Sequence, residues 1–203
     1  MRMWNISYNV WWEYDDRTKT VYIRGHGDMP EFSLDDDEKD ADIPWLDLDF
    51  ERAVVDYGIT SIGTHAFLNC KRLRYAYLSD TVVDINDFAF EGCTGLVSVR
   101  LPERLILLGN SAFFGCRSLR DIRLPDRLIN ISDYAFHGCS SLKVLEIPEG
   151  VEMIGSRSFY DCKSLTLVID RNRRMDIEDD AFDEDVRLVG RKAERRDFTD
   201  TEE

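Results

Sequence analysis

Residues 96–119 read LVSVRLPERLILLGNSAFFGCRSL, and residues 119–142 repeat the pattern as LRDIRLPDRLINISDYAFHGCSSL. Phenylalanine and cysteine return in this pattern at a fixed interval of 23 residues. The phenylalanine column is Phe67, Phe90, Phe113, Phe136, Phe159 and Phe182, and the cysteine column is Cys70, Cys93, Cys116, Cys139 and Cys162. A fixed period of about 20 to 50 residues indicates stacked units that bury their apolar faces against one another, so we expect a solenoid.

Each unit divides into a strand and a return. Apolar residues occupy the L positions of an LxxLxL segment, as in Leu96, Val99 and Leu101, and the last three positions alternate with the period of a β-strand. A proline such as Pro102 then ends the strand, because proline cannot donate a hydrogen bond to a sheet. The rest of the unit fits a bend and a short irregular or helical return. We therefore expect an α/β solenoid with one parallel sheet along one face.

Three segments are expected along the chain. Residues 1–49 read as an N-terminal capping β-hairpin followed by an acidic loop at 31–43. Residues 50–189 carry the repeat array. Residues 190–203 contain almost no apolar side chains and are expected to form a charged, flexible tail.

The net charge of −14 is concentrated at the two ends of the chain. Residues 1–58 contain 6 basic and 15 acidic residues, residues 174–203 contain 6 and 12, and residues 59–173 contain 14 and 13. This distribution offers no basic stripe for phosphates, so a nucleic-acid partner is not expected. No run of about 18 apolar residues predicts membrane insertion. The first residues lack the apolar core of a signal peptide, so either the protein stays in the cytoplasm or a leader has been removed.

The cysteine column admits three interpretations. Cysteines in adjacent coils lie close enough in Cα position for a disulfide, but parallel Cβ vectors keep the Cβ atoms too far apart. Zinc sites need ligands within a few residues, as in Cys-x-x-Cys, and the chain has no such pair. Buried thiols that pack as small apolar groups and donate a weak S–H bond to the backbone are the favoured interpretation.

Neither the histidines nor the acidic loop predicts chemistry. His26, His65 and His137 share no catalytic spacing with a serine, cysteine or carboxylate, and no enzyme activity or cofactor is expected. The acidic run from Asp35 to Asp42 carries oxygen ligands of the kind that calcium prefers, but it lacks the glycine and spacing of an EF-hand loop. A solvated loop is therefore favoured there.

The outward positions of the strands carry the functional prediction. Inward columns are monotonous, whereas outward positions vary from strand to strand in a way that structure alone does not require. The predicted partner-binding residues are Tyr75, Tyr77, Arg100, Arg123 and Glu146, with Asp121 and Ser98 at the margin. Tyrosine and arginine are enriched at interface hot spots, and guanidinium groups give planar, bidentate donors. The alternative is that these side chains only stabilise their neighbours across the sheet.

The repeat resembles the BspA-like leucine-rich repeat, also called the Treponema pallidum type. The resemblance rests on the unit LxxVxLPxxLxxIGxxAFxGCxxL, in which phenylalanine and cysteine stand three residues apart and a leucine follows three further on. It extends over roughly residues 10–190. The lead-in before the repeats is also similar, with a Gly-x-Gly-x-Met stretch from Gly25 to Met29, the pair Pro44 and Trp45, and a first Gly-Ile-Thr-Ser-Ile-Gly that ends at Gly63.

The resemblance implies a right-handed rod or horseshoe with the sheet on its concave face. It also implies a non-enzymatic role in protein or matrix recognition, commonly at microbial surfaces, which would require export. We therefore expect a monomeric module of adhesion or recognition type that binds a protein or glycoprotein on the concave sheet. The alternative is a structural spacer or assembly segment that docks through its ends.

Overall fold

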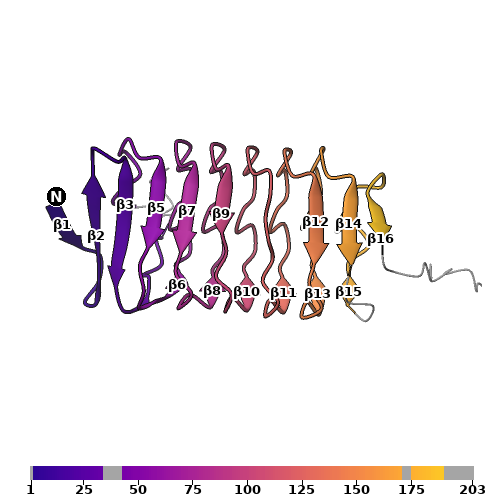
Figure 1. Cartoon of the computed structure of the whole chain (residues 1–203), viewed down its shortest axis with the longest axis horizontal. Coiled ribbons are helices and arrows are strands. Elements are labelled where there is room, and N and C mark those ends of the chain that lie inside the picture. Colours follow the sequence, from indigo (N-terminus) through magenta and orange to yellow (C-terminus); the bar gives the residue numbers. More distant parts are fainter. Residues whose placement is uncertain (1, 34–42, 171–174, 190–203) are drawn as a thin grey trace, which may run out of the picture.

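The computed structural model describes residues 2–33, 43–170 and 175–189. Its strands stand side by side in a straight row, so the molecule is a rod rather than a horseshoe (Figure 1). Most of the acidic loop expected at 31–43, and the whole tail expected at 190–203, lie outside the described residues.

The longer strands form one face of the rod. They belong to a six-stranded sheet and, further along the row, to a three-stranded sheet. In spatial order the first sheet comprises β1 (Arg2–Asn5), β2 (Val10–Asp15), β3 (Thr20–Gly25), β5 (Arg52–Val55), β7 (Tyr75–Leu78) and β9 (Ser98–Arg100). The second comprises β12 (Val144–Ile147), β14 (Leu167–Asp170) and β16 (Arg187–Val189).

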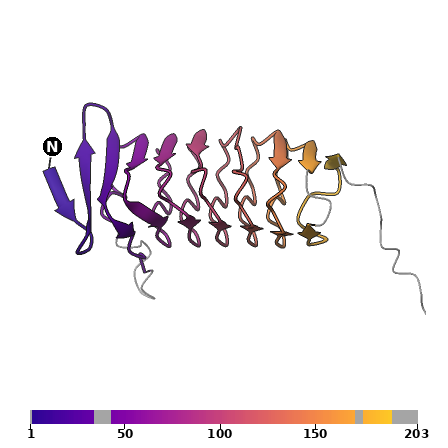
Figure 2. The same cartoon turned by 60° about the horizontal axis from the view of Figure 1, so that its bottom comes forward.

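Shorter strands form a second ladder along another edge of the rod, which Figure 2 brings forward. They are β4 (Gly27–Asp28), β6 (Ile59–Ile62), β8 (Asp84–Ile85), β10 (Leu107–Leu108), β11 (Asn130–Ile131), β13 (Met153–Ile154) and β15 (Asp176–Ile177). Each pairs in parallel with the next. The prediction of one parallel sheet is therefore wrong. Stacking brings the return flank of every coil against the same flank of the next coil, so its backbone pairs as well.

The phenylalanine column is the centre of the core. Neighbouring rings from Phe67 to Phe182 lie 5.0 to 5.2 Å apart between centroids, with interplanar angles of 12° or less. Trp45 continues the stack, because its ring centroid lies 5.5 Å from that of Phe67. The indole Nε1–H of Trp45 donates to the carbonyl oxygen of Ala66 at 2.9 Å, so the polar group of this fully buried side chain is satisfied.

The predicted hairpin is formed by β2 and β3, which pair antiparallel from Val10 opposite Gly25 to Asp15 opposite Thr20. Every second side chain of the hairpin points into the core, as the sequence pattern indicates, and Val10 and Ile23 are at most 1% exposed. β3 then pairs in parallel with β5. The hairpin therefore adds two antiparallel strands to the sheet of the repeats.

No helix occurs among residues 2–33, 43–170 and 175–189, so the α part of the expected α/β class is wrong for them. The returns consist of tight turns. In each, an N–H bonds to the carbonyl three residues earlier, as from Ala66 to Gly63 and from Leu68 to His65. His65 and Asn69 have φ angles of 59° and 56°, and left-handed residues recur at both positions in later coils. A helix cannot propagate through two such residues in one short return. Consistently, no described segment could cross a membrane as a helix.

The sheet on the outward face is interrupted at one coil. β9 is the last strand of the first sheet and β12 is the first of the next, while residues 121–124 between them form no strand. An isolated bridge from Ser98 to Asp121 is the one pairing of this segment within the described ranges. The rod is straight and its sheet divided, so the continuous concave surface expected for this face is not observed (Figure 1).

Candidate partner-binding face

The outward side chains of β7 begin the candidate face. Tyr77 exposes 55% of its surface. Tyr75 is half-buried, and the guanidinium carbon of Arg52 lies 5.7 Å from the centroid of its ring. This distance is within the range of a cation–π contact. Tyr75 is therefore held by a neighbour in the sheet, whereas most of Tyr77 faces solvent.

The next strand, β9, places Ser98 beside Tyr75 and Arg100 beside Tyr77. Paired residues of neighbouring strands lie about 5 Å apart, so a guanidinium and a phenol share this part of the surface. Nη2 of Arg100 lies 3.7 Å from Oδ2 of Asp80, and both side chains are more than half exposed. An exposed ion pair of this length contributes little to stability, so Arg100 can exchange Asp80 for another anion at low cost.

The other three predicted residues lie beyond the edge of this sheet. Asp121 and Arg123 are exposed on the coil that forms no strand. Glu146 is exposed on β12, where it pairs with Ile169 of β14 in the three-stranded sheet. The structure thus puts all seven predicted residues on the outward face. It brings Tyr75, Tyr77, Ser98 and Arg100 together by strand pairing, and an isolated bridge joins Asp121 to Ser98.

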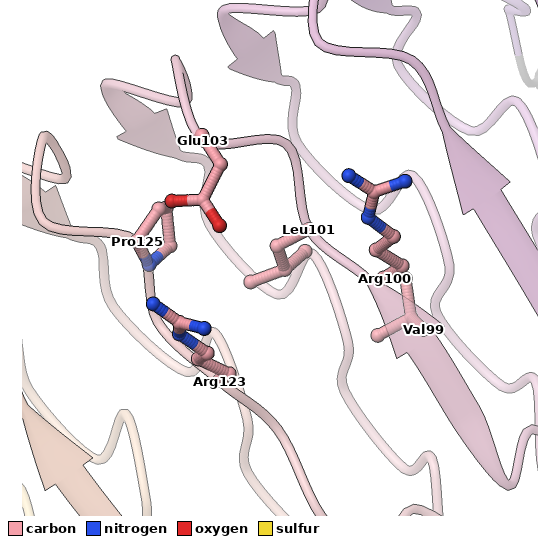
Figure 3. A pocket seen from close by; sticks show the side chains of 6 residues that line it. All are labelled: Val99, Arg100, Leu101, Glu103, Arg123 and Pro125. Carbon is pink, nitrogen blue, oxygen red and sulfur yellow. The ribbon is translucent and has the colours of Figure 1, made fainter.

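A cavity of about 180 Å³ opens at the interruption of the sheet (Figure 3). Its lining residues are Val99, Arg100, Leu101, Glu103, Arg123 and Pro125. Leu101 lies between the two arginines, and the carboxylate of Glu103 lies on the side of Arg123 (Figure 3). Two of the predicted residues, Arg100 and Arg123, therefore border a hollow that the sequence pattern did not indicate.

A row of aromatic side chains on the return edge is a feature that the sequence reasoning missed. The His65 ring stacks on Phe88 at 5.1 Å, and the Phe114 ring stacks on His137 at 4.8 Å. His137 is half-buried, and its ring centroid also lies 5.8 Å from that of Tyr160. Two aromatic-rich columns at the 23-residue interval carried this signal. Because the rings stack face to face, they offer mainly their edges to a ligand.

The titratable side chains of the described residues form no metal site, and the thiols among them are buried. No group of three or more His, Cys, Asp or Glu side chains among them could hold a metal ion. All five cysteines are unbridged and buried, and burial raises the pKa of Cys70 and Cys162 to about 12. Thiols with so high a pKa are poor nucleophiles at neutral pH. Burial also raises the pKa of Glu91, while the nearby His65 opposes that shift.

Comparison with known proteins places this geometry among bacterial leucine-rich repeat structures. A leucine-rich repeat protein from Eubacterium ventriosum has a TM-score of 0.69 and 25% identity, over 85% of this chain and 45% of the other. The T. pallidum leucine-rich repeat protein has a TM-score of 0.60 and 26% identity, over 78% of this chain and 67% of the other.

The pneumococcal vaccine antigen PcpA shares the fold, with a TM-score of 0.61 and 23% identity over 68% of this chain and 35% of its own. The chain thus spans less than half of the Eubacterium ventriosum and pneumococcal proteins. None of the curated proteins compared with it matches.

The family comparison is more direct than these structural likenesses. Residues 60–188 match the BspA-type leucine-rich repeat region in 6 copies, which covers more than half of the sequence. The chain belongs to the BspA-type leucine-rich repeat family.

Proposed function

We propose that the chain is a non-enzymatic module that binds a protein or glycoprotein partner across the outward face of its two sheets. Leucine-rich repeat folds are typically non-enzymatic binding scaffolds, and membership in this family points to protein–protein interaction. Binding would be of adhesion or recognition type, with complementarity to a rigid, extended surface in place of chemistry.

The observation that carries the proposal is the contrast between Tyr77 and its inward neighbours. Tyr77 is 55% exposed, whereas Ala76 and Leu78 on either side of it are 2% exposed. Folding does not require a large aromatic side chain there, because Tyr77 contributes little to the core. Beside Arg100 it forms a pair of residue types enriched at binding hot spots.

The test is a capture experiment with the purified chain against host-surface and own-cell extracts. The face variant combines Tyr77→Ala with Arg100→Glu. The control combines Tyr57→Ala with Arg127→Glu, because these exposed residues lie in turns outside the strands and match the face variant in chemistry. A partner retained by the control and lost from the face variant supports the proposal. Equal retention by both variants would overturn the assignment of this face.

A structural role through the ends of the rod is the second candidate. β16 is the terminal strand of the three-stranded sheet, and its residues Leu188 and Val189 are each 38% exposed. An exposed apolar edge strand is a template for pairing with another chain. Light scattering tests this role. Concentration-dependent oligomers that disappear in a Leu188→Lys, Val189→Lys variant would favour end-to-end assembly, whereas a monomer at every concentration would exclude it.

A further inference from the structure

Strand pairing is interrupted on the outward face and continuous on the opposite edge. β8, β10, β11 and β13 pair without interruption. On the outward face, the chain between the arrows of β9 and β12 runs without a strand (Figure 1). Strand pairing is therefore interrupted on the outward face of this coil, while the second ladder stays continuous and the core phenylalanine rings keep their spacing of 5.1 and 5.2 Å.

The inward side chains are slightly less buried where the pairing is interrupted. Ile122 is 9% exposed and Leu101 is 6% exposed, although both occupy inward columns. The corresponding residues of the next strand, Leu145 and Ile147, are 0% exposed. Water therefore reaches the core further at this coil than at its neighbour.

Like charges oppose strand pairing at this coil. Tyr77 pairs with Arg100, and one more step of the same register would place Arg100 directly opposite Arg123. Like charges directly opposite each other in neighbouring strands are destabilising. Among the described residues Arg123 has no ion pair, and Arg100 has only the 3.7 Å contact with Asp80. The two guanidinium groups border the cavity together with a single carboxylate, that of Glu103 (Figure 3).

We infer that this opening is an anion-binding subsite that takes the carboxylate of an acidic side chain on an extended peptide of the partner. The inference rests on the proposed function and names the chemistry of that partner. Two planar guanidinium forks match a carboxylate in geometry and charge. The cavity of about 180 Å³ between these groups is open to solvent on the outward face, so a carboxylate can reach both guanidinium groups.

Glu103 also lines the cavity and limits the strength of this subsite. Its carboxylate lies on the side of Arg123 and would repel an acidic ligand (Figure 3). Removal of that charge should therefore strengthen binding. This gives the test a variant that gains affinity, which a misfolded protein could not do.

The probe is a capped peptide of sequence Thr-Val-Glu-Val-Thr, with a copy that carries glutamine in place of glutamate. Both are titrated into the isotope-labelled chain and followed by nuclear magnetic resonance. The glutamate peptide should shift the backbone amides of residues 121–124 and the Nε–H signals of Arg100 and Arg123. The glutamine peptide should bind roughly threefold to fivefold more weakly, as expected for the loss of exposed ion pairs.

The variants separate this subsite from general electrostatics. Arg123→Gln should abolish the difference between the peptides, and Glu103→Gln should tighten the glutamate peptide by about twofold to threefold. Arg127→Gln, an exposed arginine of the same coil outside the cavity lining, should change neither. Equal binding of the two peptides would overturn the inference. So would inorganic phosphate that shifts these signals when the glutamate peptide does not, because the site would then serve a free anion.

The experiments distinguish a failure of the subsite from a failure of the proposed function. A captured partner that is lost from the Tyr77→Ala, Arg100→Glu variant but binds Arg123→Gln with unchanged affinity would leave the function standing and remove the subsite.

Discussion

The Sγ atom of Cys93 lies 3.0 Å from the carbonyl oxygen of Phe67, which precedes it by 26 residues and belongs to the previous coil. The same S–H donation joins three further cysteines to the phenylalanine column at 3.2 to 3.3 Å. The two most regular columns of the sequence are therefore linked through the backbone. The predicted role of the cysteines as buried thiols that donate to the backbone is confirmed for these four.

The buried thiols predict resistance to alkylation. A thiol reagent at pH 8 should leave the native protein almost unlabelled and should label all five cysteines after unfolding, because burial keeps the thiols protonated and covered. The measurement is mass spectrometry after timed alkylation. Rapid labelling of the folded chain would contradict the buried column.

The same burial predicts a loss of stability at alkaline pH. The pKa of Cys70 rises from 9.0 to about 12 in the folded chain, and those of Cys93, Cys116 and Cys139 are also raised. Unfolded thiols release their protons above pH 9 while folded ones keep them. The stabilisation is therefore complete below about pH 9 and is lost as the pH rises towards 12.

Each thiol should lower the free energy of unfolding by about 1.4 kcal/mol per pH unit in this window. Urea unfolding at several pH values between about 8 and 11 measures how the free energy of unfolding changes with pH. A Cys93→Ala variant should reduce this slope by the contribution of one thiol, about 1.4 kcal/mol per pH unit. A free energy of unfolding that stays level across this range would show that the thiols are not buried in solution.

The phenylalanine stack predicts that Phe→Ala substitutions destabilise the protein more in the middle of the rod than at its end. Phe113 is fully buried between Phe90 and Phe136, with centroids 5.1 and 5.2 Å away. Phe113→Ala should lower the free energy of unfolding by about 3 to 5 kcal/mol, because it removes a whole ring from a closed core. Phe182→Ala is the matched control. It should cost clearly less, since Phe182 is only partly buried and stacks on Phe159. Equal losses in chemical denaturation would contradict this account.

Gly115 offers a test of backbone strain alone. Its φ is 69°, and a Cβ added there would meet no atom within 4 Å. Gly115→Ala should therefore lower the free energy of unfolding by about 1 to 2 kcal/mol through left-handed strain without a clash. Gly115→Asn should cost less, because Asn69 and Asp161 occupy the same column at φ 56° and 58°. Identical effects of alanine and asparagine in denaturant unfolding would argue against a left-handed requirement.

Ser158 predicts a stabilising substitution. It stands in a column of alanines, is 0% exposed, and its Oγ has no hydrogen-bond partner in the part of the chain that the structure covers. Ser158→Ala should raise the free energy of unfolding by about 1 kcal/mol, because a buried hydroxyl without a partner costs desolvation energy. The reverse substitution, Ala135→Ser, should lower it. A destabilised Ser158→Ala protein in thermal or urea unfolding would mean that the hydroxyl has a partner in solution.

Much of the fold could be predicted because the inward columns report burial directly. Phe113 and Cys116 are buried in the structure as the 23-residue period predicts, and Val10 and Ile23 lie inside the hairpin. The helical return could not be excluded in the same way. His65 and Phe88 have φ angles of 59°, yet neither residue type signals a left-handed backbone as glycine would. The column of glycines with Asn69 and Asp161 does indicate a left-handed backbone, because these residue types tolerate it.

The candidate face was predictable only as a set of outward positions. The alternation that buries Ala76 and Leu78 also directs Tyr75 and Tyr77 outwards, and this follows from strand period alone. Whether Arg123 continues that surface depends on the distance between two coils. The sequence of a single repeat does not determine that distance.

The sequence by itself determined the coil, its 23-residue length and its apolar interior, because burial of the same columns recurs in every unit. Only the tertiary structure decided how the coils relate: the second ladder, the stacked aromatic row, and the opening between Arg100 and Arg123. These features depend on side chains and backbone groups of different coils facing one another. Burial is a property of one residue, whereas pairing and repulsion belong to two residues that folding brings together.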